Sequence, residues 1–179
     1  MFGYSVESSI SLKIMEQRHA KGYFDFVMRN RDYLINWIPF VSKVESITDT
    51  TDYIIRYLEK FKNGDGVLLG LWDYDIFIGT LVIREIDKEA KWAEIGYMID
   101  QNYQRRGLTK KSCSILIDYL FHELDLNRVE ICCNEENTGS RKVAESLGFR
   151  LEGTIREHMK INNKIGTMMI YGLLRSEWK

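Results

Sequence analysis

The chain has 179 residues, of which 45% are hydrophobic and 28% charged, and its formal net charge is −1. This composition is that of a folded globular protein. The near balance of charge excludes a broadly basic surface of the kind that binds nucleic acid non-specifically. A chain of this length suits one domain, which we expect to span residues 1–179.

The cysteines and histidines predict neither a disulfide framework nor a metal centre. Three cysteines, Cys113, Cys132 and Cys133, are an odd number without framework spacing, which favours reduced thiols in a cytoplasmic protein. The three histidines share no metal-ligand spacing with them. No apolar run approaches the ~20 residues needed to cross a bilayer, and residues 1–5 do not resemble a signal peptide. We therefore expect no metal and no membrane partner.

The first half of the chain predicts a strand, two helices and three further strands. The second helix is expected to have Asp49 or Thr50 as its N-cap, with apolar residues on one face. The first helix must end before Pro39, because the residue before a proline disfavours helical geometry. In chain order, the strand is 9–15, the helices are 16–38 and 49–61, and the further strands are 66–72, 76–86 and 92–99.

The second half continues with alternating helices and strands. A helix over about 109–124 repeats apolar residues at the 3.6-residue spacing of a core-facing stripe. A strand at 128–133, a short helix at 138–147 and two strands at 149–161 and 166–174 follow it. The pattern predicts a mixed α/β fold with a partly antiparallel sheet and a strand–helix–strand unit at residues 92–133.

Four cations gather where the strand 92–99 leads into the next helix. Arg105, Arg106, Lys110 and Lys111 surround Gly107. Cations are unfavourable at a helix N-terminus, so their accumulation there indicates a bound anion. Gly107 has no Cβ, which lets backbone N–H groups approach a phosphate closely. An ordinary strand-to-helix turn with solvated charges explains this segment about as well on its own.

A second motif lies in residues 134–149, which leave a strand, enter a short helix and end in Gly148-Phe149. Asn137 is suited to be the N-cap of that helix, with Ser140 in its first turn. Gly148 is suited to the left-handed position that follows a helix. Each residue taken alone is better explained by helix capping than by ligand binding, but the two motifs at this distance are unusual.

Together these motifs resemble the GNAT superfamily of acyl-CoA-dependent N-acyltransferases. Gln104-x-x-Gly107-x-Thr109 resembles the family's pyrophosphate loop, with Thr109 where the family has Gly or Ala. Residues 36–40, 93–97 and 151–153 are similar to the RimJ/RimL branch, the ribosomal-protein N-terminal acetyltransferases. The resemblance implies an α/β fold with a mostly antiparallel sheet of about seven strands, flanking helices and a splayed central parallel pair.

The resemblance also implies acetyl-CoA as the co-substrate, with no metal. Its diphosphate would lie on the backbone N–H groups of residues 106–110. Its pantetheine arm would pair with the strand that ends at Met98 and Ile99, and a backbone N–H near Met98 would polarise the thioester carbonyl. The expected cofactor-binding residues are Met98, Ile99, Gln104, Arg105, Arg106, Gly107, Leu108, Thr109, Lys110, Lys111, Asn137 and Ser140.

The expected catalytic residues are Glu94, Ser140 and Tyr171. Glu94 is the candidate general base, acting through water; an ion pair on the strand surface is an equally good explanation of it. Ser140 would protonate or orient the departing thiolate. Tyr171 lies on the late strand where the family often places the tyrosine of that step, although a core aromatic is at least as good an interpretation. Met159 occupies the position of a glutamate in the related ribosomal enzymes.

The acceptor is the least determined part of the prediction. The branch resemblance implies the N-terminal α-amino group of a ribosomal protein, with Trp37, Phe40 and Tyr97 as pocket walls or as ordinary core residues. A polyamine or aminoglycoside acetyltransferase and a non-catalytic acyl-CoA-binding protein are the alternatives. We expect a cytoplasmic homodimer or larger homo-oligomer without direct nucleic-acid contact.

Overall fold

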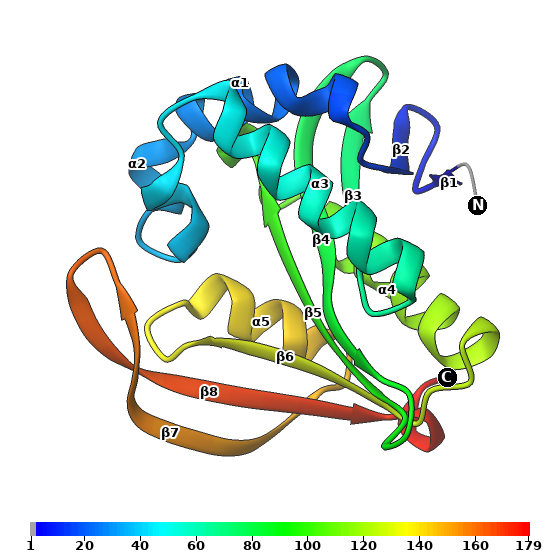
Figure 1. Ribbon diagram of the computed structural model, residues 1–179. Helices are drawn as coiled ribbons and strands as arrows, with labels where there is room; N and C mark the ends of the chain where they lie inside the picture. The colour runs from blue at the N-terminus through cyan, green and yellow to red at the C-terminus, as the bar shows by residue number, and fades with distance from the viewer. Residues whose placement is uncertain (1–2) are drawn as a thin grey trace.

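The computed structural model describes residues 3–179 and contains one mixed sheet (Figure 1). Residues 1 and 2, the start of the segment judged for a signal peptide, lie outside the described residues. The sheet has the strand order β1-β2-β3-β4-β5-β6-β8-β7. All neighbouring pairs are antiparallel except β5 and β6, which are parallel. The expected mostly antiparallel sheet with a central parallel pair is confirmed, and the short strand β1 (Tyr4–Ser5) is an addition to the predicted strands.

The strands of the first half lie close to their predicted positions. They are β2 (Ile10–Ile14), β3 (Val67–Asp73), β4 (Ile76–Asp87) and β5 (Trp92–Ile99). β3 is buried from Val67 to Trp72, and β4 from Phe77 to Ile83. Strands covered on both faces have near-continuous apolar sequences, which is why the sequence located them so well.

The single helix predicted over 16–38 is wrong in its extent. The chain forms a 3₁₀ turn η1 (Gln17–His19), helix α1 (Ala20–Arg29), a short helix α2 (Arg31–Leu34) and a second 3₁₀ turn η2 (Pro39–Lys43). Glu16 is extended and caps η1. Asn30 interrupts the helix because its side-chain amide donates to the Phe26 carbonyl oxygen at 3.0 Å, while its backbone leaves helical geometry.

The predicted N-cap of the next helix is also wrong. Helix α3 (Ile47–Asn63) begins three residues earlier than Asp49 would allow, with Ser46 as its N-cap. Asp49 is instead the third helical residue, and its carboxylate accepts the N–H groups of Glu45 and Ser46 at 2.9 and 2.7 Å. Ser46 and Asp49 thus form a capping box, in which a side chain of the first helical turn accepts the backbone N–H of the N-cap residue.

The second half follows the prediction more closely. After the 3₁₀ turn η3 (Gln101–Tyr103) come α4 (Leu108–Asp118), β6 (Arg128–Asn134), α5 (Thr138–Ser146), β7 (Arg150–Ile161), β8 (Lys164–Leu174) and the 3₁₀ turn η5 (Arg175–Glu177). The helix predicted to reach Leu124 keeps α-helical geometry only to Asp118. It ends in a π-helical turn, η4 (Tyr119–Glu123).

Helices cover both faces of the sheet and make two cores. On one face, α1 and α3 contribute Tyr23, Phe26 and Ile54 to a cluster that includes Met98 of β5. On the other face, α4 and α5 contribute Leu116 and Ala144 to the larger cluster with Ile95 and Tyr171. Figure 1 shows α1 and α3 in front of β3 and β4, with α4 and α5 on the far side. Successive residues of β5 therefore point alternately into two different environments.

The parallel pair separates after four residues. β5 pairs with β6 from Trp92↔Arg128 to Ile95↔Ile131. Beyond that point β5 continues to pair with β4 as far as Ile99, and β6 continues with β8 as far as Asn134. Figure 1 shows the two strands diverging from this point. The backbone of residues 96–99 consequently has hydrogen-bonding groups on the β6 side that no strand partner uses.

The β7–β8 hairpin reaches across toward α2. Its register is shifted at Glu152 and again at residues 156–158, where Glu157 has a positive φ of 53°. At the tip, the side-chain amide of Asn162 donates to Asn36 Oδ1 at 3.0 Å. The hairpin therefore contacts the helical segment that follows α2 on the far side of the opening.

Candidate active site

Glu94 lies on β5 immediately before the strands separate, on the face that α1 and α3 cover. Its carboxylate lies 3.5 Å from the Nε of Arg84, and its side chain is 22% exposed. Burial raises the pKa of Glu94, and the nearby carboxylates of Glu130 and Glu85 raise it further, while Arg84 opposes the rise. Both interpretations drawn from the sequence therefore describe this residue: it has an ion-pair partner, and it is a carboxyl group with elevated proton affinity.

Arg84 is a candidate site residue that none of the sequence motifs includes. A Cβ at Gly96 would lie 2.9 Å from the Arg84 Nε. The guanidinium therefore lies directly against Gly96, which is two residues after Glu94 on β5. A side chain at position 96 would displace it. A glycine inside a strand pattern indicates that something approaches the backbone closely, and that signal was present in the sequence.

Ser140 lies on the opposite face of the sheet and meets a tyrosine. The hydroxyl of Tyr97, on β5, and the Oγ of Ser140, on α5, are 2.9 Å apart, and the Tyr97 hydroxyl also donates to the Ser140 carbonyl oxygen at 3.1 Å. Because β5 and α5 lie on either side of the opening, this contact spans it. Burial raises the pKa of Tyr97 far above its usual value, so the phenol keeps its proton.

Tyr171 is a core residue by position. It is 1% exposed, and its hydroxyl donates to Glu145 at 3.2 Å and accepts from Arg141 at 3.3 Å, both on α5. The tyrosine hydroxyl that contacts Ser140 belongs to Tyr97. A role of Tyr171 in protonating a leaving group stays a prediction.

Asn137 caps α5 as expected from its position. Its side-chain oxygen accepts the N–H of Ser140 at 3.0 Å, which fixes the first turn of the helix. Gly148, with φ of 88°, takes the left-handed position after the helix. These contacts hold Ser140 at the opening.

The loop of residues 104–107 starts α4 in a geometry that leaves donors free. Gly107 is the N-cap residue in the left-handed conformation, with φ of 73°, and no side chain caps the helix there. The first N–H groups of a helix have no partner within the helix. A Cβ on Gly107 would meet nothing within 4 Å, so the space in front of the loop is open. This arrangement fits a phosphate group.

The cations around the loop have different surroundings. Lys111 forms an ion pair with Glu7 at 2.6 Å. The guanidinium of Arg106 lies 4.6 Å from the ring centroid of Tyr103 and donates to the Asn102 carbonyl oxygen at 2.9 Å. Arg105 is exposed and has a positive φ of 61°, and Lys110 is exposed as well.

The remaining predicted cofactor residues differ in burial. Gln104 is exposed, Thr109 is half-buried and Leu108 is buried under the helix start. Met98 and Ile99 are buried and belong to opposite faces of β5. The hydroxyl of Tyr33 donates to the Ile99 carbonyl oxygen at 3.1 Å, which connects α2 to the end of this strand.

The residues considered as acceptor-pocket walls do not form one surface. Phe40 lies 3.9 Å, centroid to centroid, from Tyr53 of α3 and 5.9 Å from Tyr23, as part of an aromatic cluster. Trp37 is half-buried beside α2. Tyr97 points to the α5 side. Core packing therefore describes Phe40.

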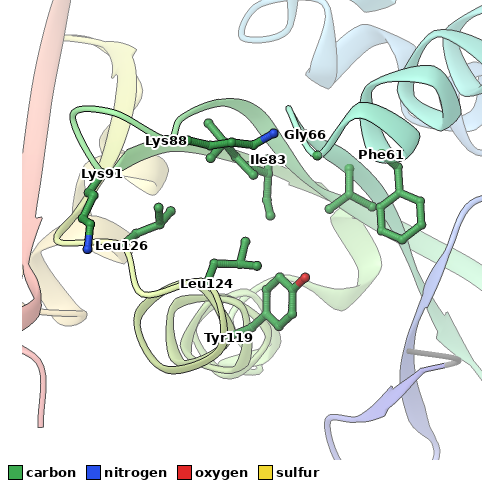
Figure 2. Close-up of a pocket in the computed structure, with 11 residues that line it drawn as sticks. Phe61, Gly66, Ile83, Lys88, Lys91, Tyr119, Leu124 and Leu126 are labelled. Atoms are coloured by element: carbon green, nitrogen blue, oxygen red, sulfur yellow. The ribbon is translucent and has the colours of Figure 1, made fainter.

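A separate hollow lies away from this site. Figure 2 shows it between the end of α3, strand β4 and the turn after α4. It has a volume of about 330 Å³, an apolar wall and two lysines at its rim. Lys91 pairs with Asp125 at 2.6 Å, and Lys88 donates to the Asn63 carbonyl oxygen at 2.8 Å. None of the predicted site residues lines it, and its cations already have partners. The wall includes Val67, Ile83, Ile86 and Leu126.

Two further features concern metals and membranes. Within residues 3–179, no group of three or more His, Cys, Asp or Glu side chains is placed to hold a metal ion. The same residues include no helix that is both long and apolar enough to cross a membrane.

Comparison with known proteins assigns the family. The model of the acetyltransferase (GNAT) domain matches residues 10–150. YdaF of Bacillus subtilis (strain 168), whose name places it provisionally among ribosomal N-acetyltransferases, is 30% identical over 180 residues, covering 100% of this chain and 98% of YdaF. The ribosomal-protein-serine acetyltransferase of Escherichia coli (strain K12) is 27% identical over 169 residues, 93% of each chain. The chain belongs to the GNAT acetyltransferase family.

A solved structure agrees with this fold. RimL, the ribosomal L7/L12 α-N-protein acetyltransferase in complex with coenzyme A, superposes with a TM-score of 0.92 at 22% identity, covering 96% of this chain and 97% of RimL. The chain is accordingly an acetyltransferase that uses acetyl-CoA, and its resemblance to the RimJ/RimL branch is confirmed.

Proposed function

We propose that the chain transfers the acetyl group of acetyl-CoA to the N-terminal α-amino group of a ribosomal protein. The observation that carries this proposal is the opening between β5 and β6, with Glu94 on one face and Ser140 on the other. The names of YdaF and of the E. coli serine acetyltransferase support the ribosomal acceptor.

The proposed donor site uses the loop and the unpaired side of β5. The N–H groups at the start of α4, with Arg105, Arg106 and Lys110, would hold the diphosphate. The backbone of residues 96–99 would pair with the pantetheine arm, and an N–H near Met98 would stabilise charge developing on the carbonyl oxygen. Acetyl-CoA supplies an activated thioester, so much of the rate would come from holding the amine against it.

The two faces of the sheet would have different tasks: one accepts the proton of the amine, and the other stabilises the leaving thiolate. An α-amino group has a pKa near 8, so its deprotonation costs about 1 kcal/mol at neutral pH. Glu94 would accept that proton through a water molecule on the α1–α3 side. On the α5 side, the Ser140 hydroxyl, which contacts Tyr97, would donate a hydrogen bond that stabilises the departing thiolate without giving up its proton.

The charges near Glu94 do not select between a peptide and a polyamine. Arg84 pairs with Glu94, and Lys60 donates to the Arg84 carbonyl oxygen at 2.6 Å. The carboxylates of Glu85 and Glu130 lie near Glu94 as well and offset these cations. The preference for a ribosomal N-terminus therefore rests on the names of the relatives.

Acceptor choice is tested by following thiol release from acetyl-CoA with N-terminal peptides that also contain an internal lysine, and with spermidine as the competitor class. We expect release with the peptides, and mass spectrometry should locate the acetyl group on the α-nitrogen. Acetylation confined to the lysine side chain, or turnover with spermidine alone, would contradict the proposal. As further proposals, the 179 residues form one domain, and the protein acts in the cytoplasm as a homodimer or larger homo-oligomer.

A further inference from the structure

Two buried polar residues join helix α1 to the segment that precedes the phosphate loop. Asn30, at the C-terminal end of α1, is 2% exposed, and Asp100, the residue after β5, is 3% exposed. The Asn30 amide donates to Asp100 Oδ2 at 3.1 Å. Asp100 also accepts from the Nε of Arg29 at 2.7 Å. Burying a carboxylate is costly unless it is well bonded, so this contact is firmly held.

The same two side chains fix the backbone of the turn η3. Asn30 Oδ1 accepts the N–H of Gln101 at 3.0 Å, and Asp100 Oδ1 accepts the N–H of Asn102 at 3.0 Å. Burial alone would raise the pKa of Asp100. The Asn102 N–H, the Asn30 amide and the Arg29 guanidinium together hold it below its usual range. Asp100 is therefore ionised and fully bonded at neutral pH.

The turn η3 supports the loop of residues 104–107. η3 ends at Tyr103, directly before Gln104 and the residues around Gly107. Arg106 folds back onto it by donating to the Asn102 carbonyl oxygen and by lying over the Tyr103 ring. Arg105 and Gly107 both have positive φ, so the loop has a conformation that its surroundings must maintain.

We propose that Asn30 is a positioning residue for the acyl-CoA diphosphate. Its amide holds the Asp100–Asn102 backbone, and through it the loop 104–107, in the geometry that receives the diphosphate. This rests on the proposed placement of the diphosphate at that loop. The residue is the C-cap of α1, outside the segments that carry the family motifs. It also connects a helix of the α1–α3 face to the donor loop.

A backbone substitution breaks the contact at position 101. Gln101→Pro removes the N–H that Asn30 accepts, and Gln101→Ala keeps it. The Asp100 backbone, with φ of −56° and ψ of 135°, is compatible with a following proline. The proline Cδ takes the place of the N–H hydrogen, so it also pushes the Asn30 side chain away from the turn. CoA affinity is measured by calorimetry, and pantetheine, which lacks the diphosphate, by displacement of CoA.

Loss of this hydrogen bond, with displacement of the Asn30 side chain, predicts that Gln101→Pro binds CoA at least about threefold more weakly than Gln101→Ala. Pantetheine affinity should be the same in both. Asn30→Leu, if it folds, should show a larger loss of the same kind. Equal CoA affinity in the two Gln101 variants, or an equal loss for pantetheine, would overturn the inference. A wild-type protein that binds pantetheine as tightly as CoA would instead overturn the proposed diphosphate site.

Discussion

Glu94 combines a raised pKa with a charged partner. Its carboxyl lies beside Arg84, and burial still moves its pKa above the ordinary value near 4.5. A group with these properties accepts a proton more readily than an exposed glutamate. The ion pair with Arg84 by itself lowers the pKa, and the effect of burial is larger.

Glu94→Gln should lower kcat by about a hundredfold to ten-thousandfold, the usual contribution of a positioned general base. In the wild type, kcat should fall as the pH drops through the raised pKa of Glu94, because only the carboxylate accepts the proton. This decrease of kcat at low pH should be absent in Glu94→Gln. The pH profiles of kcat with saturating acetyl-CoA measure both effects.

The free energy of unfolding of Glu94→Gln distinguishes a loss of catalysis from a loss of folding. A raised pKa means that the folded state binds the proton more tightly, so ionised Glu94 makes the folded state less stable above that pKa. Glu94→Gln should therefore be no less stable at pH 7. Glu89→Gln, in the exposed turn between β4 and β5, is the matched control and should leave kcat unchanged. Equal losses in the two variants would remove Glu94 as the base.

Helix α5, which carries Ser140, has a glycine near each end, and the two glycines have different backbone conformations. Gly139 lies in the first turn of the helix with no positive φ, whereas Gly148 has φ of 88°. Gly139→Ala should raise the free energy of unfolding by about 0.4–1 kcal/mol, since alanine restricts the unfolded chain. Gly148→Ala should lower it by about 1–3 kcal/mol, because alanine is strained at that φ.

Urea unfolding of the two single variants measures these changes. A Cβ at Gly139 would lie 3.7 Å from Asn137 Oδ1, and one at Gly148 would lie 3.9 Å from Leu173, so neither substitution introduces a clash. The signs should therefore follow backbone conformation alone. Shifts of the same sign in both variants would contradict the assigned ends of α5.

Helix boundaries departed from prediction where side chains compete with the helix backbone. Asn30 ended α1 because its amide found the Phe26 carbonyl and Asp100, a partner 70 residues away that no local pattern reveals. The predicted N-cap, Asp49 or Thr50, was wrong, although the Ser46-x-x-Asp49 spacing of a capping box is present in the sequence. The boundaries of buried strands such as β3 were easier to predict, since their apolar runs reflect burial on both faces.

The site was predictable as a set of motifs but not as a geometry. Residues 104–111 and 137–149 are local patterns, and their positions at the starts of α4 and α5 were expected from them. The contacts of Tyr97 with Ser140, of Arg84 with Glu94 and of Asn30 with Asp100 join distant segments. They depend on the strand order and on where β5 leaves β6, which one sequence does not specify.

The placement of the acyl-CoA diphosphate at residues 104–107 underlies the whole account. Calorimetric titration of CoA into wild type, Gly107→Val and Gly153→Val tests it most directly. A valine at position 107 is strained by the φ of 73° and projects a side chain into the open space before the loop, whereas Gly153 has open space and no positive φ.

We predict that Gly107→Val weakens CoA binding by more than about tenfold, equivalent to about 1.4 kcal/mol, while Gly153→Val binds as the wild type does. Both variants should unfold cooperatively. Unchanged CoA affinity in folded Gly107→Val would contradict the account.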